Sequence, residues 1–232
     1  MTVPSADELL ETIRAALAPH GLFLRGTVNF ADGEAGPMLA DGKPAASVVL
    51  IGNIGGSLWE PFTWWREREA DRGGADPLDK WSKQVMHPIG EAAGATTYFP
   101  SDPPWQPFQQ WAMRAEGLKP SPLGILIHPE YGLWHGYRGA LGFDRVLPQT
   151  GAVPAGHPCD ACVEKPCISA CPADAVASGA FDVARCRMHL RSEAGAGGCL
   201  AHGCLSRDAC PVGRHYRYPA VQLRFHMAAL SF

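Results

Sequence analysis

The sequence is dominated by one stretch, Cys159-Asp-Ala-Cys162-Val-Glu-Lys-Pro-Cys167-Ile-Ser-Ala-Cys171, which is followed at once by Pro172. The bacterial iron–sulfur run is C-x2-C-x2-C-x3-C-P, and this stretch differs from it by two extra residues in the middle spacer. A second group of four cysteines follows and also ends in a Cys-Pro step: Cys186, Cys199, Cys204 and Cys210. Two such groups predict two iron–sulfur clusters.

The two groups are expected to exchange one ligand each. In proteins with two such clusters, the fourth cysteine of a run ligates the other cluster. The rule predicts one ligand set of Cys159, Cys162, Cys167 and Cys210, and a second set of Cys171, Cys186, Cys199 and Cys204. Both spacings are irregular, so replacement of a ligand by His157, His189 or His202 stays open. The main alternative is a pair of zinc sites, because zinc takes the same thiolates.

Composition excludes several classes of protein. With 46% hydrophobic and 19% charged residues, the 232-residue chain has the composition of an ordinary soluble protein. The first residues lack the basic and apolar regions of a secretory signal, and no apolar run approaches the ~20 residues of a membrane span. We therefore expect a cytoplasmic protein, in which eight cysteines are more often metal ligands than disulfides. No basic run marks a nucleic-acid surface.

Residue types change sharply along the chain. All seven tryptophans lie between Trp59 and Trp134, and all eight cysteines between Cys159 and Cys210. Residues 1–150 hold 12 Lys+Arg and 17 Asp+Glu, whereas residues 151–232 hold 8 and 6, so the charge balance changes from −5 to +2. We predict an α+β domain over residues 1–150 and a cysteine-bearing, ferredoxin-like domain with a C-terminal helix over residues 151–232. Four arginines of the second part would offset the negative charge of thiolate-ligated clusters: Arg185, Arg187, Arg191 and Arg207.

Local patterns predict alternating helices and strands in the first domain. Ser5-Ala-Asp-Glu8 is a capping box, and apolar residues recur behind it at helical spacing. Further helices are expected over 59–70, 77–93 and 108–116, strands over 22–30, 47–51, 96–99 and 123–128, and a strand or hairpin over 131–143. A last helix is expected over 220–230. The order predicts a central, mostly antiparallel sheet with flanking helices.

One long motif resembles a known family. Gly124-Ile-Leu-Ile-His128-Pro-Glu-Tyr-Gly132-Leu-Trp134-His-Gly-Tyr-Arg138-Gly139, together with Asp76-Pro-Leu-Asp79, is similar to the CblC family of cobalamin-processing proteins. The resemblance implies a nitroreductase-type fold, a bound cobalamin, and pocket roles for His128, Trp134 and Arg138. From the residues alone, Trp134 also fits a core position and His128 a structural one, while Arg138 could pair with Glu130.

Residues 157–213 resemble the dicluster ferredoxin module of epoxyqueuosine reductases and reductive dehalogenases, through the segment Cys171-Pro-Ala-Asp-Ala-Val176. That resemblance implies a protein that passes single electrons from two 4Fe–4S clusters to a corrinoid in the N-terminal domain, with a redox partner protein as electron donor. A cobalamin-reducing oxidoreductase would be the corresponding enzyme. Two alternatives stay open: a ferredoxin-type electron carrier without its own substrate, and a protein with non-standard clusters or a metal-handling role.

Overall fold

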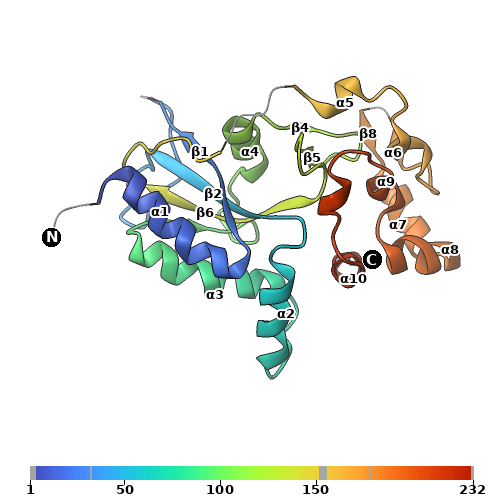
Figure 1. The fold of residues 1–232 in the computed structure, drawn as a ribbon, viewed down its shortest axis with the longest axis horizontal. Helices are drawn as coiled ribbons and strands as arrows, with labels where there is room; N and C mark the ends of the chain where they lie inside the picture. Colours follow the sequence, from blue (N-terminus) through green and yellow to red (C-terminus); the bar gives the residue numbers. More distant parts are fainter. Residues whose placement is uncertain (1–3, 32, 152–155, 178, 231–232) are drawn as a thin grey trace. The chain divides into compact units, whose positions relative to one another are not determined.

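The computed structural model describes residues 4–31, 33–151, 156–177 and 179–230 (Figure 1). Contacts divide the chain into two compact units. The first comprises Met1–Gly117 and Gly136–Val153, and the second comprises Leu118–His135 and Pro154–Phe232. The segment Leu118–His135, which the sequence analysis assigned to the first domain, thus groups with the cysteine-bearing residues. The domain division at residue 150 stays a prediction.

The first unit is built on a four-stranded sheet in the order β1-β2-β6-β3: β1 (Phe23–Asn29), β2 (Ser47–Ile54), β6 (His135–Phe143) and β3 (Thr96–Tyr98). The pairs β1–β2 and β3–β6 are antiparallel. Strand β6 also runs opposite to β2, because the Ala46 N–H donates to the Phe143 carbonyl at 2.8 Å while Gly52 lies against Gly136. The predicted central antiparallel sheet is confirmed.

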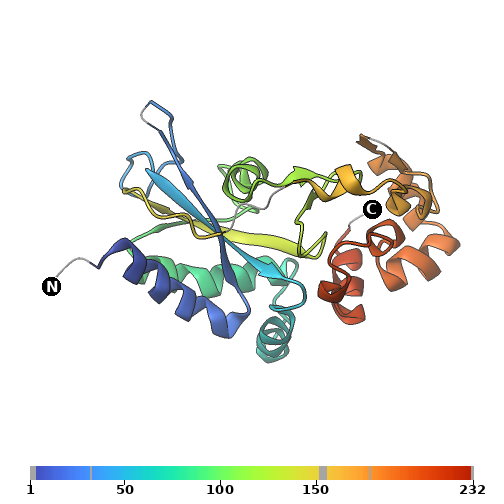
Figure 2. The same ribbon diagram turned by 45° about the horizontal axis from the view of Figure 1, so that its top comes forward.

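Helices flank this sheet on both faces (Figures 1 and 2). Helices α1 (Ala6–Leu17) and α3 (Pro77–Ala92) cover one face, and α4 (Phe108–Glu116) lies against the other. Helix α2 (Trp59–Arg68) packs against α3. Helix α1 begins at the predicted capping box: the Glu8 N–H donates to the Ser5 hydroxyl at 3.3 Å, and the Ser5 N–H donates to the Glu8 carboxylate at 2.9 Å.

A buried ion pair ties α4 to the sheet. The side chains of Arg25 and Glu116 are only 2% and 4% exposed and approach to 3.0 Å. Arg25 also donates to the Asn53 carbonyl at 3.1 Å, and the Tyr137 hydroxyl donates to Glu116. Burial raises the pKa of Glu116, which Arg25 and Tyr137 partly offset. Because removal of one partner would leave a buried charge unpaired, this contact fixes the position of α4.

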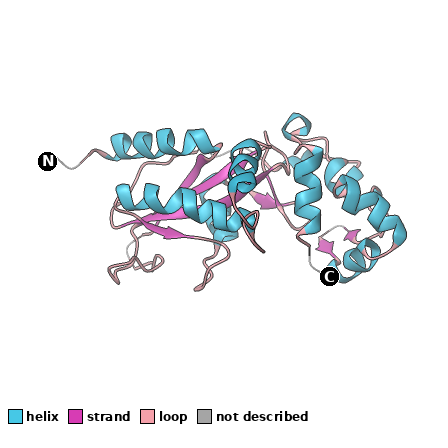
Figure 3. Cartoon of the chain, turned by 90° about the horizontal axis from the view of Figure 1, so that it is seen from below, coloured by secondary structure: helices cyan, strands magenta, loops and turns pink. Residues whose placement is uncertain are grey.

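The second unit contains short elements joined by turns (Figure 3). Its strands are β4 (Lys119–Pro120), β5 (Leu126–Ile127), β7 (Val176–Ala177) and β8 (Ala180–Phe181). Its α-helices are α5 (Pro158–Ala161), α6 (Pro166–Ser169), α7 (Val183–Leu190), α8 (Glu193–Gly195), α9 (Leu205–Asp208) and α10 (Ala220–Ala228). Three segments of 3-10 or π-helix complete the described chain: Ala18–His20, Ala196–Leu200 and Arg214–Tyr216.

The predicted strand over residues 123–128 is wrong in extent. Only Leu126 and Ile127 form a strand, paired with Lys119–Pro120. The residues before them form a turn, in which the Gly124 N–H donates to the Ser121 carbonyl at 2.9 Å and Gly124 has a positive φ of 76°. An apolar run therefore became a turn because glycine admits the left-handed backbone. The predicted C-terminal helix is confirmed as α10.

Cysteines form part of the core of the second unit. Buried side chains of the 118–135 segment pack with buried cysteines in one cluster: Leu123, Ile127, Leu133, Cys167, Val176 and Cys210. Gly132 makes this packing possible, because a Cβ there would lie 2.0 Å from the Val212 carbonyl oxygen. Within the described residues, no helix has the length and apolar character needed to cross a membrane.

Candidate functional site

Four thiols from distant parts of the sequence lie together in the second unit. Cys159, Cys162, Cys167 and Cys210 line one common cavity, which the apolar side chains of Leu123, Ile127 and Leu133 close. Burial, followed by the negative charges of Cys210, Cys167 and Cys162, raises the pKa of Cys159 to about 11. In the stretched middle spacer, Val163 is 92% exposed, whereas Lys165, which has a positive φ of 42°, lines the cavity.

The other four thiols form a second group. Burial, followed by the charges of Cys204, Cys171 and Cys199, raises the pKa of Cys186, which lies on α7. Cys199 lies on the π-helical segment, and Cys204 precedes α9. The structure therefore brings Cys171 to the second group and Cys210 to the first.

Backbone N–H groups point at several of these sulfurs. The Ala175 N–H donates to the Cys171 sulfur at 3.3 Å. Burial alone would raise the pKa of Cys171, but hydrogen bonds from the N–H groups of Ala173 and Ala175 lower it below the ordinary value. The Val212 N–H acts in the same direction on the sulfur of Cys210, where burial has the larger effect and raises the pKa above its ordinary value. These loops favour negatively charged sulfur.

Among the described residues, no group of three or more His, Cys, Asp or Glu side chains is arranged to hold a metal ion or cluster. Of the three candidate histidines, His157 lines a cavity of about 290 Å³ together with Cys159. The Nε2 of His189 is buried without a partner among the described residues, and His202 is exposed.

His128 lies at the start of the turn that follows β5. Its side chain is 7% exposed, and its Nδ1 accepts hydrogen bonds from the N–H groups of Glu130 and Tyr131 at 3.0 and 3.2 Å. The imidazole stacks on the Tyr131 ring with a centroid distance of 4.0 Å. Because Nδ1 accepts both of these hydrogen bonds, it stabilises the backbone of the turn.

Trp134 and Arg138 lie in different units. Trp134 is 2% exposed and packs against Tyr218 and Leu223, with the Arg207 guanidinium 4.4 Å from the centre of its ring. Arg138 belongs to β6 of the first unit and lies 3.7 Å from Asp79 of α3, the acidic residue that forms part of the same sequence motif.

Sequence reasoning missed one buried hydroxyl in the second group. Ser206 is 1% exposed, and the Cys171 sulfur is the group that its buried hydroxyl can hydrogen-bond. It lies near the Cys171 sulfur and is one of the groups that lower the pKa of that thiol. No sequence pattern marks it, because a serine one residue after Cys204-Leu205 has no distinctive spacing.

Comparisons with known proteins identify a fold. No protein-family model matches the chain, and no curated protein is significantly similar in sequence. Among solved structures, the B12-trafficking protein CblC of C. elegans, a homologue of human MMACHC, matches with a TM-score of 0.56 at 14% identity. The match covers 96% of this chain and 91% of that protein. The fold is similar to that of CblC. Because the match covers nearly the whole chain, it includes most of the cysteine-bearing half, and a separate ferredoxin domain is not shown.

Proposed function

We propose that this protein is an iron–sulfur redox protein that supplies single electrons to a corrinoid. The observation that carries the proposal is the arrangement of the eight thiols in two groups, with Cys171 and Cys210 exchanged between them. This exchange is what a protein with two 4Fe–4S clusters requires, and neither a disulfide framework nor a pair of independent zinc sites needs it.

The donor set fits such clusters chemically. All eight groups are cysteine thiols, which are the usual ligands of iron–sulfur clusters. Backbone N–H groups directed at sulfur stabilise the thiolate form and leave room for hydrogen bonds to cluster sulfides. When bound, the clusters would supply one-electron redox chemistry.

The chain itself would hold and insulate these clusters. Leu123, Ile127 and Leu133 close the first group against water, which favours electron transfer over side reactions of exposed sulfur. The exposed loop around Val163 gives an electron donor protein access to the first group.

The corrinoid is proposed from the fold and the motif together. The fold likeness is to a B12-trafficking protein, and the motif from Gly124 to Gly139 is similar to the CblC family. Of the three motif residues, His128 and Trp134 are buried and would stabilise the conformation of the segment from Gly124 to Gly139. Arg138, with a side chain that is 22% exposed, is the one with a surface for direct contact with the corrinoid amides.

The buried position of Trp134 favours one alternative, an electron carrier that binds no corrinoid. Anaerobic titration with cob(II)alamin separates the two functions. We expect cob(II)alamin to bind saturably. The dithionite-reduced protein should reduce one cobalt by one electron for each electron that it holds. A control with Cys167→Ala and Cys171→Ala, which removes one ligand from each group, should not reduce cob(II)alamin. Redox-active protein that neither binds nor reduces cob(II)alamin would establish the carrier function instead.

A further inference from the structure

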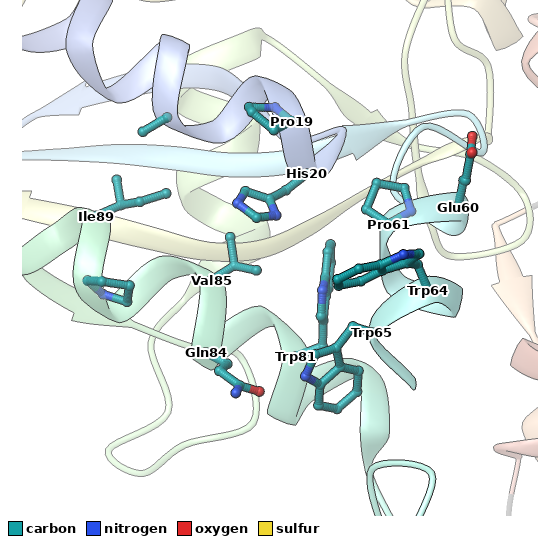
Figure 4. A pocket seen from close by; sticks show the side chains of 12 residues that line it. Pro19, His20, Glu60, Pro61, Trp64, Trp65, Trp81, Gln84, Val85 and Ile89 are labelled. Carbon is teal, nitrogen blue, oxygen red and sulfur yellow. The ribbon is translucent and has the colours of Figure 1, made fainter. Parts of the chain in front are cut away.

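The first unit contains a cavity that the proposed function does not use. It has a volume of about 850 Å³ and lies entirely within this unit, between the end of α1, helix α2 and helix α3. Small-molecule sites in proteins have volumes of roughly 300–1,000 Å³. Figure 4 shows side chains from these three segments gathered around it.

Its walls are aromatic and rigidly held. Trp64, Trp65 and Trp81 line the cavity together with His20. The buried Phe62 fixes two of the indoles: it contacts Trp81 edge-on with a centroid distance of 5.8 Å and stacks on Trp65 at 6.1 Å. Because these rings are held by a common core residue, the cavity is preorganised for a flat aromatic ligand.

One polar group of the wall lacks a partner. The Nε1–H of Trp65 is buried and has no acceptor among the described residues. The other edge of this indole packs over Gly73, where a Cβ would lie within 3.0 Å of the ring. A buried donor without an acceptor is costly, so a ligand with an acceptor atom, such as a ring nitrogen or carbonyl, would complete it.

The one formal charge among the described lining residues is negative, while the cations of Arg68 and Lys80 lie over the Trp64 and Trp65 rings. Glu60 carries the one formal charge among the described lining residues, and neither lysine nor arginine is present there. Burial lowers the pKa of His20, which keeps the imidazole neutral at pH 7. The Trp64 ring already holds a cation on one face, since the Arg68 guanidinium lies 3.7 Å from its centre. Indole faces and a carboxylate favour cations and neutral rings over phosphates or carboxylates.

We propose that this cavity binds a planar nitrogen-heteroaromatic molecule that is uncharged or cationic. The ring stacks among Trp64, Trp65 and Trp81, and its acceptor faces the Trp65 N–H. A positive charge on the ring gains from Glu60. This site is independent of the cysteine groups and of any corrinoid, so its test and that of the proposed function fail separately.

Three probes with one scaffold and a free ring nitrogen test the site by equilibrium dialysis against the protein: quinoline, 4-(trimethylammoniomethyl)quinoline and quinoline-4-carboxylate. We expect saturable 1:1 binding of the first two and at least about tenfold weaker binding of the carboxylate. Glu60→Gln should weaken binding of the trimethylammonium probe about threefold or more and leave quinoline unchanged. Equal or tighter binding of the carboxylate, or no saturable binding of quinoline and of the trimethylammonium probe, would overturn the proposal.

Two exposed tryptophans provide a matched pair of variants. Trp64 is 59% exposed and lines the cavity, whereas Trp105 is 77% exposed and is not among its lining residues. Neither substitution removes a core side chain, so both variants should fold. Trp64→Ala should weaken both binding probes about fivefold, as expected for loss of an aromatic contact. Trp105→Ala should change neither affinity, and equal effects of the two substitutions would contradict the site.

Discussion

Cys167 and Cys171 are four residues apart in sequence, yet they lie in different thiol groups. Cys167 lies with Cys159, Cys162 and Cys210, and Cys171 lies near Cys186 and Cys204. Pairs of substitutions distinguish this arrangement from an uncrossed one, in which each sequence run would hold its own cluster.

The double variant Cys171→Ala/Cys204→Ala should lose one cluster and keep about four irons per chain. Cys167→Ala/Cys171→Ala should lose both, because it removes a ligand from each group. Iron analysis of anaerobically purified protein is the measurement. The reverse result, with four irons kept only by the second variant, would show that the clusters are not crossed.

Ser206 is expected to tune one cluster. Its buried hydroxyl lies near the Cys171 sulfur, and a hydrogen bond to ligand sulfur stabilises the more negative, reduced cluster. Ser206→Ala should lower one of the two reduction potentials by about 40 mV, which corresponds to a roughly fivefold change in a one-electron equilibrium constant. An EPR-monitored redox titration measures both potentials. The exposed Ser169 on α6 provides the control, and Ser169→Ala should shift neither.

For individual residues, the sequence predicted which cysteines would lie together but not which other side chains contact them. The Cys-Pro steps predict which cysteines lie together, because that rule depends on local spacing alone. The contacts of Ser206, and of Arg207 with Trp134 and Tyr218, depend on how distant segments pack. Such contacts leave no periodic signal in the sequence.

Among the elements, the turn that follows His128 has a specific glycine requirement. Gly132 and Gly124 both have a positive φ, 59° and 76°. A Cβ on Gly132 would lie 2.0 Å from the Val212 carbonyl oxygen, whereas on Gly124 its nearest neighbour would be 4.0 Å away. An alanine at Gly124 would therefore add backbone strain alone, whereas an alanine at Gly132 would add both backbone strain and a steric clash.

Gly124→Ala should cost about 1–2 kcal/mol, the penalty of a left-handed backbone. Gly132→Ala should cost that amount and about 1–3 kcal/mol more, because the turn must move away from Val212. The urea concentration at which iron is released reports on this unit in both variants. Equal midpoints for the two variants would contradict the close approach of the turns.

Element prediction succeeded where local chemistry decides the structure. The capping box placed the start of α1, and the continuous apolar run Ser47–Ile51 marked β2. It failed over residues 123–128, where apolar character reflects burial against the cysteine loops and only two residues pair as a strand. Burial in an irregular core and burial in a sheet give the same hydrophobic pattern.

For the whole molecule, the two units are expected to depend differently on the clusters. The first unit has a continuous sheet and a core of aliphatic and aromatic side chains. The second has several helices of three or four residues, and its core includes cysteine sulfurs. If the proposed clusters are bound, a unit with so little regular structure would gain much of its stability from them.

Removal of iron should therefore unfold the second unit selectively. After treatment with a chelator and an oxidant, limited proteolysis should cut within residues 156–230 and leave the sheet-bearing residues of the first unit protected. Mass spectrometry locates the cuts. Equal protection of both units with and without iron would show that the second unit is stable on its own.

The proposed electron transfer depends on which metal the eight thiols bind. Iron and acid-labile sulfide should be measured on protein purified without oxygen. We predict about eight irons and about eight sulfides per chain, as two 4Fe–4S clusters require. Zinc without sulfide would contradict the proposed electron transfer.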